Sequence, residues 1–300
     1  MAPVGSLAVG LALALDAAVG EPPEQFHPVV ALGAVIEWLD RPYGAPRLVG
    51  VAIAIILPLG AALAAAVPVA VLQSWHPIAA GVLAGLLLFT TFSHRLLVDL
   101  ATDVIDATAT DLDAAKTAVV GLVGRDTTAL DAAEVRSAAV ESLAENLADG
   151  LVAPITAFAL GSLVSLPLGV GAAVWVKAVN TLDSMLGYRD RPLGTGSARL
   201  DDVAEWLPAR LSAGLIALAA GDPGGLGRAR AWARDPPSPN SGWPMATMAA
   251  VLDTRLLKPG EYDLNPGAAL PDRETALAGV TVGRRAGWLA VALAGVIAWF

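Results

Sequence analysis

Cysteine is absent from this 300-residue chain. Without thiols the protein forms no disulfide bonds, and cysteine-held zinc and iron–sulfur clusters are excluded. Any bound metal must therefore take oxygen or imidazole ligands. The sequence also lacks the phosphate-loop, paired-histidine metalloprotease and nucleophile-elbow serine motifs, so a nucleotide site of the usual phosphate-loop kind is not expected.

Charged residues are scarce, at 16% of the chain compared with roughly 25% in soluble domains. Aromatic residues make up only 5%, whereas 55% of residues are hydrophobic and the mean hydropathy is +0.61. Lysine occurs only at Lys116, Lys177 and Lys258, and the net charge is −9. This acidic, lysine-poor composition is like that of proteins from halophilic archaea, whose salty cytoplasm screens charge repulsion. No basic stripe is present, so nucleic acid is not an expected partner.

The uncharged runs are long enough to cross a lipid bilayer. No Asp, Glu, Lys or Arg occurs between Arg47 and Arg95, and one span needs about 20 apolar residues. This run therefore predicts two spans, with a turn at Pro77 between them. We expect an all-α, polytopic membrane protein that forms a single domain over residues 1–300. The expected spans are residues 1–18, 48–72, 78–93, 150–176 and 286–300, and the polar segments are 95–149, 177–210 and 222–285.

The run 150–176 is interrupted by Pro154, Gly161, Pro167 and Gly169. A single crossing would place the basic residues of 177–210 outside the cell, although basic residues flanking spans prefer the cytoplasm. We therefore expect a broken or re-entrant hairpin that returns to the same side. The polar segments, with their amphipathic helices, are then cytoplasmic. Irregular backbone at membrane depth is tolerated where it lines a cavity or is buried in protein, so a functional site is expected nearby.

The first polar cluster lies directly before this run. Glu141, Glu145 and Asp149 share one face of a predicted helix, where three carboxylates repel one another unless a cation lies among them. A solvated acidic face is the ordinary explanation of such a pattern. Its place at the membrane edge favours a magnesium site with oxygen ligands, or a network paired with arginine.

The second cluster follows the run. Lys177, Asn180 and Ser184 share a helix face, and Asp183 lies beside it. Polar groups at a membrane boundary are costly and usually mark a site. A helix end from which Lys177 reaches the water would give the same pattern.

The third cluster pairs Asp201 and Asp202 with Arg199 and Arg210. Carboxylates bind Mg²⁺ and guanidinium groups bind phosphate oxygens, so this composition fits a nucleotide–metal site. A salt-bridge network within the membrane would have the same composition. His27 stands alone, and a lone histidine is more often a packed loop residue than a catalyst.

These clusters, together with further short strings of the sequence, resemble the CobD/CbiB family of cobalamin biosynthesis, the adenosylcobinamide-phosphate synthases, which are integral membrane proteins. The resemblance covers most of the chain, from about residue 16 to 265, with its strings in the family's order. One departure is Glu205, which stands where the family usually has Asn. The strings are Gly20-Glu21-Pro22-Pro23 with His27-Pro28-Val29, Arg125-Asp126-Thr127, Glu141 to Pro154, Lys177 to Tyr188, Ala198 to Arg210, and Ser238-Pro239-Asn240-Ser241-Gly242-Trp243-Pro244.

The resemblance implies an ATP- and Mg²⁺-dependent ligase that joins (R)-1-amino-2-propanol O-phosphate, or aminopropanol, to a propionate carboxylate of adenosylcobyric acid. The lipid bilayer and other enzymes of the corrinoid pathway are the further expected partners. The residues expected to act in catalysis are Glu141, Glu145, Asp183, Asp201, Asp202 and His27, with Glu141, Glu145, Asp201 and Asp202 also as metal ligands. Those expected to bind substrate or phosphate are Arg125, Lys177, Asn180, Ser184, Arg199, Arg210 and Asn240.

Two other classes of function fit the same sequence. A membrane carrier binds ions or substrates with carboxylates on broken helices. Such carboxylates are expected in the middle of spans, whereas the run between Arg47 and Arg95 contains none. A non-catalytic membrane scaffold for corrinoid enzymes is the other alternative. The clustering of carboxylates at the cytoplasmic edge favours an enzyme supplied from the cytosol.

Overall fold

The structure is a computed structural model that describes residues 2–23, 25, 27–123, 126–188 and 191–300. The chain divides into two compact units that alternate along the sequence. Unit 1 comprises Met1–Ser93, Ala153–Glu205 and Val291–Phe300, and unit 2 comprises His94–Val152 and Trp206–Ala290. The expectation of a single domain stays a prediction, because two compact units can belong to one domain.

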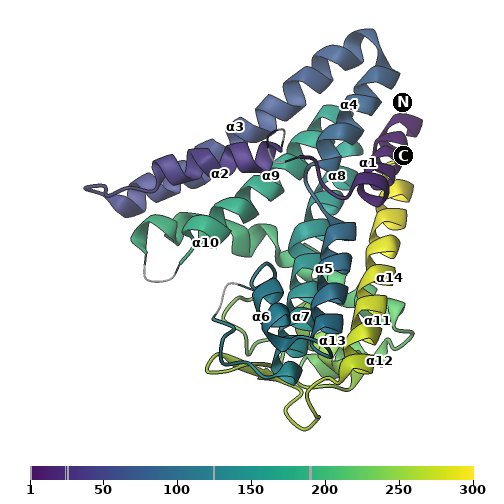
Figure 1. The fold of residues 1–300 in the computed structure, drawn as a ribbon. Helices are drawn as coiled ribbons and strands as arrows, with labels where there is room; N and C mark the ends of the chain where they lie inside the picture. Colours follow the sequence, from purple (N-terminus) through teal and green to yellow (C-terminus); the bar gives the residue numbers. More distant parts are fainter. Residues whose placement is uncertain (1, 24, 26, 124–125, 189–190) are drawn as a thin grey trace. The chain divides into compact units, whose positions relative to one another are not determined.

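Helices form almost all of both units (Figure 1). Unit 1 contains α1 (Ala2–Val19), α2 (Pro28–Leu39), α3 (Pro46–Trp75), α4 (Pro77–Phe89), α8 (Ala153–Ser162), α9 (Leu166–Leu186), the short helix η3 (Pro192–Gly194) and α10 (Thr195–Ala204). Unit 2 contains α5 (His94–Ala107), α6 (Leu112–Val119), α7 (Ala132–Leu147), the π-helical turn η2 (Ala148–Val152), α11 (Trp206–Ala219), α12 (Gly224–Ala229), α13 (Gly242–Leu252) and the antiparallel strands β1 (Leu256–Lys258) and β2 (Tyr262–Leu264). Helix α14 (Arg273–Ile297) begins in unit 2, and its last turns belong to unit 1.

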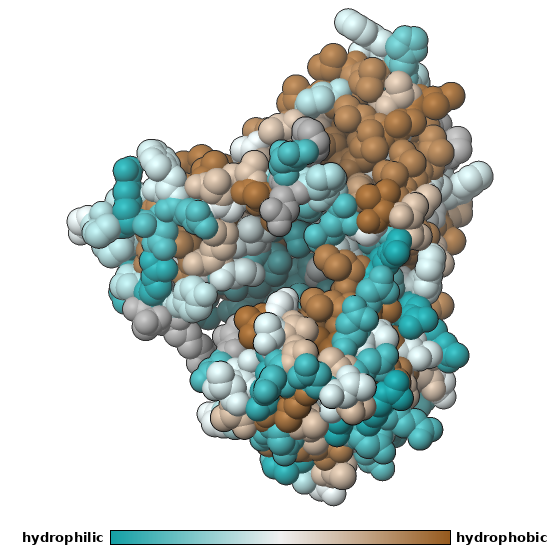
Figure 2. Space-filling view, viewed as in Figure 1, coloured by the Kyte–Doolittle hydropathy of each residue, from teal (hydrophilic) through white to brown (hydrophobic). Residues whose placement is uncertain are grey.

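The predicted hairpin between Arg47 and Arg95 is formed by α3 and α4. His76 alone separates the two helices, because Pro77 occupies the first turn of α4, where its missing N–H costs no hydrogen bond. Large apolar side chains on this hairpin are exposed, among them Ile56, Leu63 and Ile78. Figure 2 shows hydrophobic side chains gathered over the α3–α4 hairpin. Such a surface is stable only in an apolar solvent, so the all-α membrane class is confirmed.

Four helical segments are long and apolar enough to cross a membrane, among the residues that the structure describes. They are Pro46–Trp75, Pro77–Ala107, Ala132–Ser162 and Arg273–Ile297. The first agrees with the expected span at 48–72. The other three extend into segments that we expected outside the hydrocarbon. Arg284 and Arg285, for example, lie within α14 instead of preceding it, because charged residues do not by themselves end a helix.

The interrupted run at 150–176 is a helical hairpin. Helix α8 ends at Ser162, and α9 begins at Leu166 after Ser165, whose side chain accepts a hydrogen bond from the N–H of Leu168. The two helices approach closely at Gly161 and Gly169, where a Cβ built on Gly161 would lie 2.8 Å from the Cα of Gly169. The break that we predicted from proline and glycine is therefore present. Whether the hairpin is re-entrant stays a prediction.

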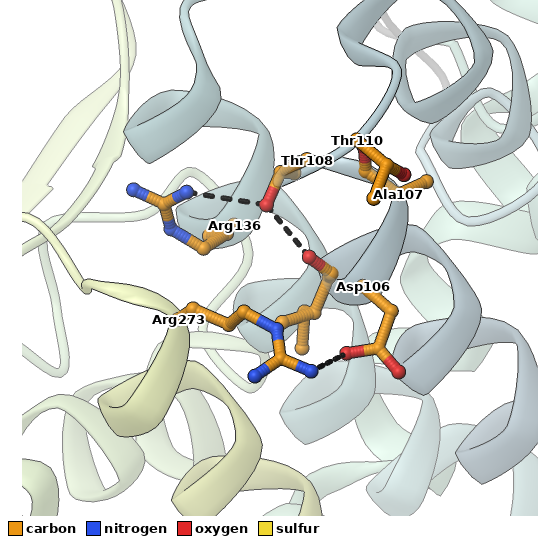
Figure 3. Close-up of polar contacts among 7 residues, drawn as sticks. Asp106, Ala107, Thr108, Thr110, Arg136 and Arg273 are labelled. Atoms are coloured by element: carbon orange, nitrogen blue, oxygen red, sulfur yellow. Dashed lines mark hydrogen bonds and ion pairs between the residues drawn. The ribbon is translucent and has the colours of Figure 1, made fainter.

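Unit 2 is held together partly by polar contacts between its helices. Asp131 caps α7 and forms a reciprocal capping box with Glu134. Figure 3 shows a second group, in which Arg273 at the start of α14 pairs with Asp106 of α5 at 2.7 Å. Beside it, Arg136 of α7 donates to the hydroxyl of Thr108 at 3.1 Å. These contacts join α5, α7 and α14 within the unit.

We predict that Gly161→Ala destabilises the protein by about 1–3 kcal/mol, because the added methyl group overlaps backbone atoms of α9 that cannot turn away. Gly10→Ala in α1 is the matched control, since no heavy atom lies within 4 Å of its new Cβ. It should change the stability by no more than about 1 kcal/mol. Thermal unfolding in lipid nanodiscs, followed by circular dichroism, measures both. Equal unfolding temperatures for the two variants would contradict this account of the hairpin.

Candidate functional site

Asp183 is a carboxyl group of unit 1 with a strongly raised pKa. It lies on the last turns of α9, half-buried, and its Oδ1 is buried without a hydrogen-bond partner in the described part of the chain. Burial raises the pKa of Asp183 to about 6, and the negative charge of the nearby Asp202 contributes in the same direction. The structure therefore brings together Asp183 and Asp202, which the sequence placed in separate clusters. A carboxyl group with this pKa can gain and lose a proton close to neutral pH.

Backbone contacts at glycines hold α10 close to α9 and α3. A Cβ on Gly194 would overlap the carbonyl oxygen of Leu186 at the end of α9, and a Cβ on Gly50 would overlap the carbonyl oxygen of Leu193. The short helix η3 therefore packs with its backbone directly against both long helices. Helix α10 starts from this contact, which places Asp201 and Asp202 beside the end of α9.

Gly187 provides the space that the carboxyl group of Asp183 occupies. It caps α9, with its N–H donating to the carbonyl oxygen of Asp183 at 2.7 Å. A Cβ at this position would overlap Oδ1 of Asp183. The orientation of the Asp183 carboxyl group thus depends on a residue without a side chain.

The predicted substrate-binding residues of this region lie on the same two helices. Arg199 is exposed on α10, with its guanidinium 4.0 Å from the Asp202 carboxylate. Ser184 is exposed on α9, and its hydroxyl donates to the carbonyl oxygen of Asn180 at 2.9 Å. The guanidinium of Arg199 therefore lies beside Asp202 on α10, and Ser184 follows Asp183 on α9.

Lys177 lines a chamber of about 250 Å³ and is the only charged residue among the described residues of its wall. Apolar side chains of α2, α3, α4 and α9 form the rest of its wall, together with Thr90 and Thr91. His27 caps α2, since its Nδ1 accepts the N–H of Val29 at 3.2 Å. Burial lowers the pKa of His27, against an opposing effect of Glu21. Because Nδ1 is used as the acceptor, the neutral ring carries its proton on Nε2.

In unit 2, two predicted phosphate-binding residues contact each other. The guanidinium of Arg210 donates to the side-chain oxygen of the buried Asn240 and to the carbonyl oxygen of Pro239 at 3.1 Å. It also stacks on two indole rings, 4.8 Å from the centroid of Trp206 and 5.4 Å from that of Trp243. Arg210 therefore fixes the loop before α13, and these contacts occupy much of the hydrogen-bonding and stacking capacity of its guanidinium group.

Glu141 lies buried on α7. Its Oε1 accepts from the hydroxyl of Ser137 at 2.5 Å, and its Oε2 accepts from the hydroxyl of Tyr262 at 2.8 Å. Ser137 in turn accepts the N–H of Leu257 at 2.8 Å. The network fastens the β1–β2 hairpin to α7, so the position of Glu141 is that of a structural carboxylate. Its catalytic and metal-binding roles stay predictions.

The remaining predicted residues are less informative. Glu145 is half-buried on the next turn of α7, and Arg125 lies outside the described residues. Within the described ranges, no three His, Asp or Glu side chains gather as a ready metal site. Mg²⁺ usually binds through one or two carboxylates, with substrate phosphates and water completing the set. The donor chemistry of Asp183, Asp201 and Asp202 therefore fits that ion.

Some contributors to the site were not predicted from the sequence. The close approaches of Gly50, Gly187 and Gly194 have no local signal, since glycine at a helix end has many explanations. The stacking of Trp206 on Arg210 could have been found, because the two residues are four apart on one helix. The bond from Tyr262 to Glu141 joins residues 121 apart in the sequence, and no spacing rule reaches that far.

The chain is similar to known proteins over most of its length. The family model described as CobD/Cbib protein matches residues 9–290. The chain is 36% identical to the probable cobalamin biosynthesis protein CobD of Methanothrix thermoacetophila, over 96% of this chain and 95% of that protein. It is 39% identical to CobD of Rhodobacter capsulatus, with 84% and 82% covered, and 36% identical to CbiB of Salmonella typhimurium, with 85% and 83% covered. No solved structure matches the chain.

We predict that Asp202→Asn lowers the pKa of Asp183 from about 6, because it removes the neighbouring negative charge. The pKa should stay above its ordinary value, since burial is the larger cause and is unchanged. Infrared difference titration in the absence of Mg²⁺ measures the protonated carboxyl band, and Asp183→Asn identifies it. The exposed Asp113→Asn should leave the titration unaltered. An unchanged midpoint in Asp202→Asn would show that the two carboxyl groups do not interact.

Proposed function

Because this chain belongs to the CobD/CbiB family of cobalamin biosynthesis proteins, we propose that it is an adenosylcobinamide-phosphate synthase. The reaction joins the amino group of (R)-1-amino-2-propanol O-phosphate to the propionate carboxylate of adenosylcobyric acid. The observation that carries this proposal within the molecule is the carboxyl pair of Asp183 and Asp202, with a pKa close to neutrality at Asp183. Amide formation needs both an acceptor for a proton and oxygen ligands for a metal.

The chemistry requires that the carboxylate be activated. A carboxylate oxygen is a poor leaving group, so it first takes a phosphoryl group from ATP, releasing ADP, or an adenylyl group, releasing pyrophosphate. The ammonium group of the second substrate must lose a proton before its nitrogen attacks the activated carbonyl carbon. Phosphate or AMP then leaves, and the amide remains.

The residues of unit 1 supply the groups for these steps. Asp201 and Asp202 would hold Mg²⁺, which would supply positive charge to neutralise the ATP phosphates. Asp183 accepts the proton from the ammonium group, for which a pKa close to the working pH is suited. Arg199 and Lys177 bind phosphate oxygens, Arg199 from its exposed position beside Asp202. His27 positions the loop before α2, since its Nδ1 is occupied by the cap.

The same proposal places the reaction at the cytoplasmic face of the membrane. Arg47 lies at the start of α3, and Arg41 and Arg95 flank the α3–α4 hairpin in the sequence; basic residues flanking spans prefer the cytoplasm. ATP and corrinoid substrates are then supplied from the cytosol. The carrier and scaffold alternatives both predict that the purified protein makes no amide.

The proposal is tested with purified protein in lipid nanodiscs, supplied with adenosylcobyric acid, ATP, Mg²⁺ and aminopropanol phosphate. We expect adenosylcobinamide phosphate by mass spectrometry, with consumption of ATP. Absence of product from protein that is folded by circular dichroism would reject the enzyme assignment. Parallel reactions with unphosphorylated aminopropanol establish which amine is used.

The roles of the acidic residues are separated by kinetics. Asp183→Asn should lower kcat by about 10²- to 10⁴-fold, as expected for loss of a general base, with a smaller effect on the Mg²⁺ concentration for half-maximal rate than Asp202→Asn. Asp202→Asn should raise that Mg²⁺ concentration. The double variant Asp103→Ala and Asp113→Ala removes exposed carboxylates of unit 2 and should retain full activity. Full activity after Asp201→Ala with Asp202→Ala would exclude this cluster as the site.

A further inference from the structure

Helix α2 is apolar around its whole circumference, yet half of it is uncovered. Its inner face packs through Leu32, Ile36 and Leu39 against α3 and α9, and Ile36 is fully buried. On the outer side, 52% of Val30 and 65% of Trp38 are exposed. Glu37 is the only charged residue in the helix. A helix that is apolar all round is covered by protein or by lipid, so the outer face of α2 has a partner.

The length and the ends of α2 decide how it meets that partner. Its 12 residues extend about 18 Å, too short for a hydrocarbon core of about 30 Å. The helix starts after His27 and ends at Leu39, and the following residue, Asp40, forms an ion pair with Arg191. Both ends are thus polar, and neither suits the interior of a bilayer. A helix with an apolar middle and two polar ends fits the plane of the membrane surface.

The residues that follow α2 carry positive charge and aromatic rings. The guanidinium of Arg41 lies over the Trp38 ring, 4.7 Å from its centroid, and donates to the hydroxyl of Tyr43 at 3.2 Å. Arg47 is also exposed, at the start of α3. Tryptophan and tyrosine concentrate at the membrane–water boundary, and clustered arginines there attract anionic lipids.

We infer that α2 lies in the plane of the membrane–water interface, with Val30 and Trp38 among the upper parts of the acyl chains and Arg41 and Arg47 at anionic phospholipid headgroups. The surface continues that of α3, where Leu48 is 75% exposed. A second copy of the chain is the competing partner. The arginines beside this face favour lipid, because two identical faces would bring like charges together.

The natural absence of cysteine allows spin labels to be attached at single introduced sites. Val30→Cys and Glu37→Cys lie on the same flank of α2, seven residues apart. If the helix lay across the membrane, the two labels would differ in depth by about 10 Å. In the plane of the interface they have nearly equal depths, about 5–10 Å below the headgroups.

Power saturation in nanodiscs compares collisions with oxygen, which enters lipid, and with a water-soluble nickel chelate. Leu63→Cys on α3 is the lipid control, and Asp113→Cys on α6 is the water control. We expect both α2 labels at intermediate and matching depths. Nickel accessibility equal to that of Asp113→Cys would overturn the inference, as would a depth difference near 10 Å. Spectral broadening that disappears on mixing with unlabelled chains would identify a second copy as the partner instead.

The headgroup preference is tested with a fluorophore at Val30→Cys and spin-labelled lipids as quenchers. Spin-labelled phosphatidylglycerol should quench more than spin-labelled phosphatidylcholine. Arg41→Gln with Arg47→Gln should abolish the difference, whereas Arg230→Gln, an exposed change in unit 2, should preserve it. Equal quenching by the two lipids in the natural background would overturn the part of the inference that concerns anionic headgroups.

Discussion

The direct contact between backbones at η3 is the constraint on which the candidate site depends. Two carboxylates repel each other, and the charge of Asp202 raises the pKa of Asp183, so packing of the surrounding chain must oppose this repulsion. Gly194 lets η3 lie against the end of α9, and Gly50 lets it lie against α3. Packing along the two long helices α3 and α9 stabilises this contact, and the contact determines where Asp183 and Asp202 lie. Geometry of this kind keeps a costly arrangement in place.

The charged residues predicted from the sequence differ in whether their polar atoms have hydrogen-bond partners within the protein. Glu141 and Arg210 both form hydrogen bonds within unit 2. Glu141 accepts one from the β1–β2 hairpin, and Arg210 donates one to the loop before α13. Asp183 differs, because one of its oxygens is buried without a partner in the described chain. A buried polar atom without a hydrogen bond is destabilising, and strain, catalysis or a bound water or ion explains its presence. The sequence shows all three only as charged residues near apolar runs.

The features that could be predicted from sequence are those with local physical causes. The α3–α4 hairpin follows from the uncharged run and from Pro77, and the break near Ser162 follows from closely spaced proline and glycine. Charged residues do not mark the start of α14, which begins at Arg273 and continues through Arg284 and Arg285. The meeting of Asp183 with Asp202 required the path of the chain through η3, which no periodicity encodes.

Burial and neighbouring charge act on Asp183 in the same direction, and this has a consequence for ligand binding. Each disfavours the ionised form, so near neutral pH the empty pair is held in an unfavourable charge state. A cation held by Asp202 would reverse the sign of the second effect, since attraction of Asp183 to the cation would replace repulsion by the Asp202 anion. The repulsion between the two carboxylates would therefore favour binding of a cation beside them. A bound cation also lowers the pKa of Asp183, so proton release and metal binding are coupled at this pair, as linkage requires.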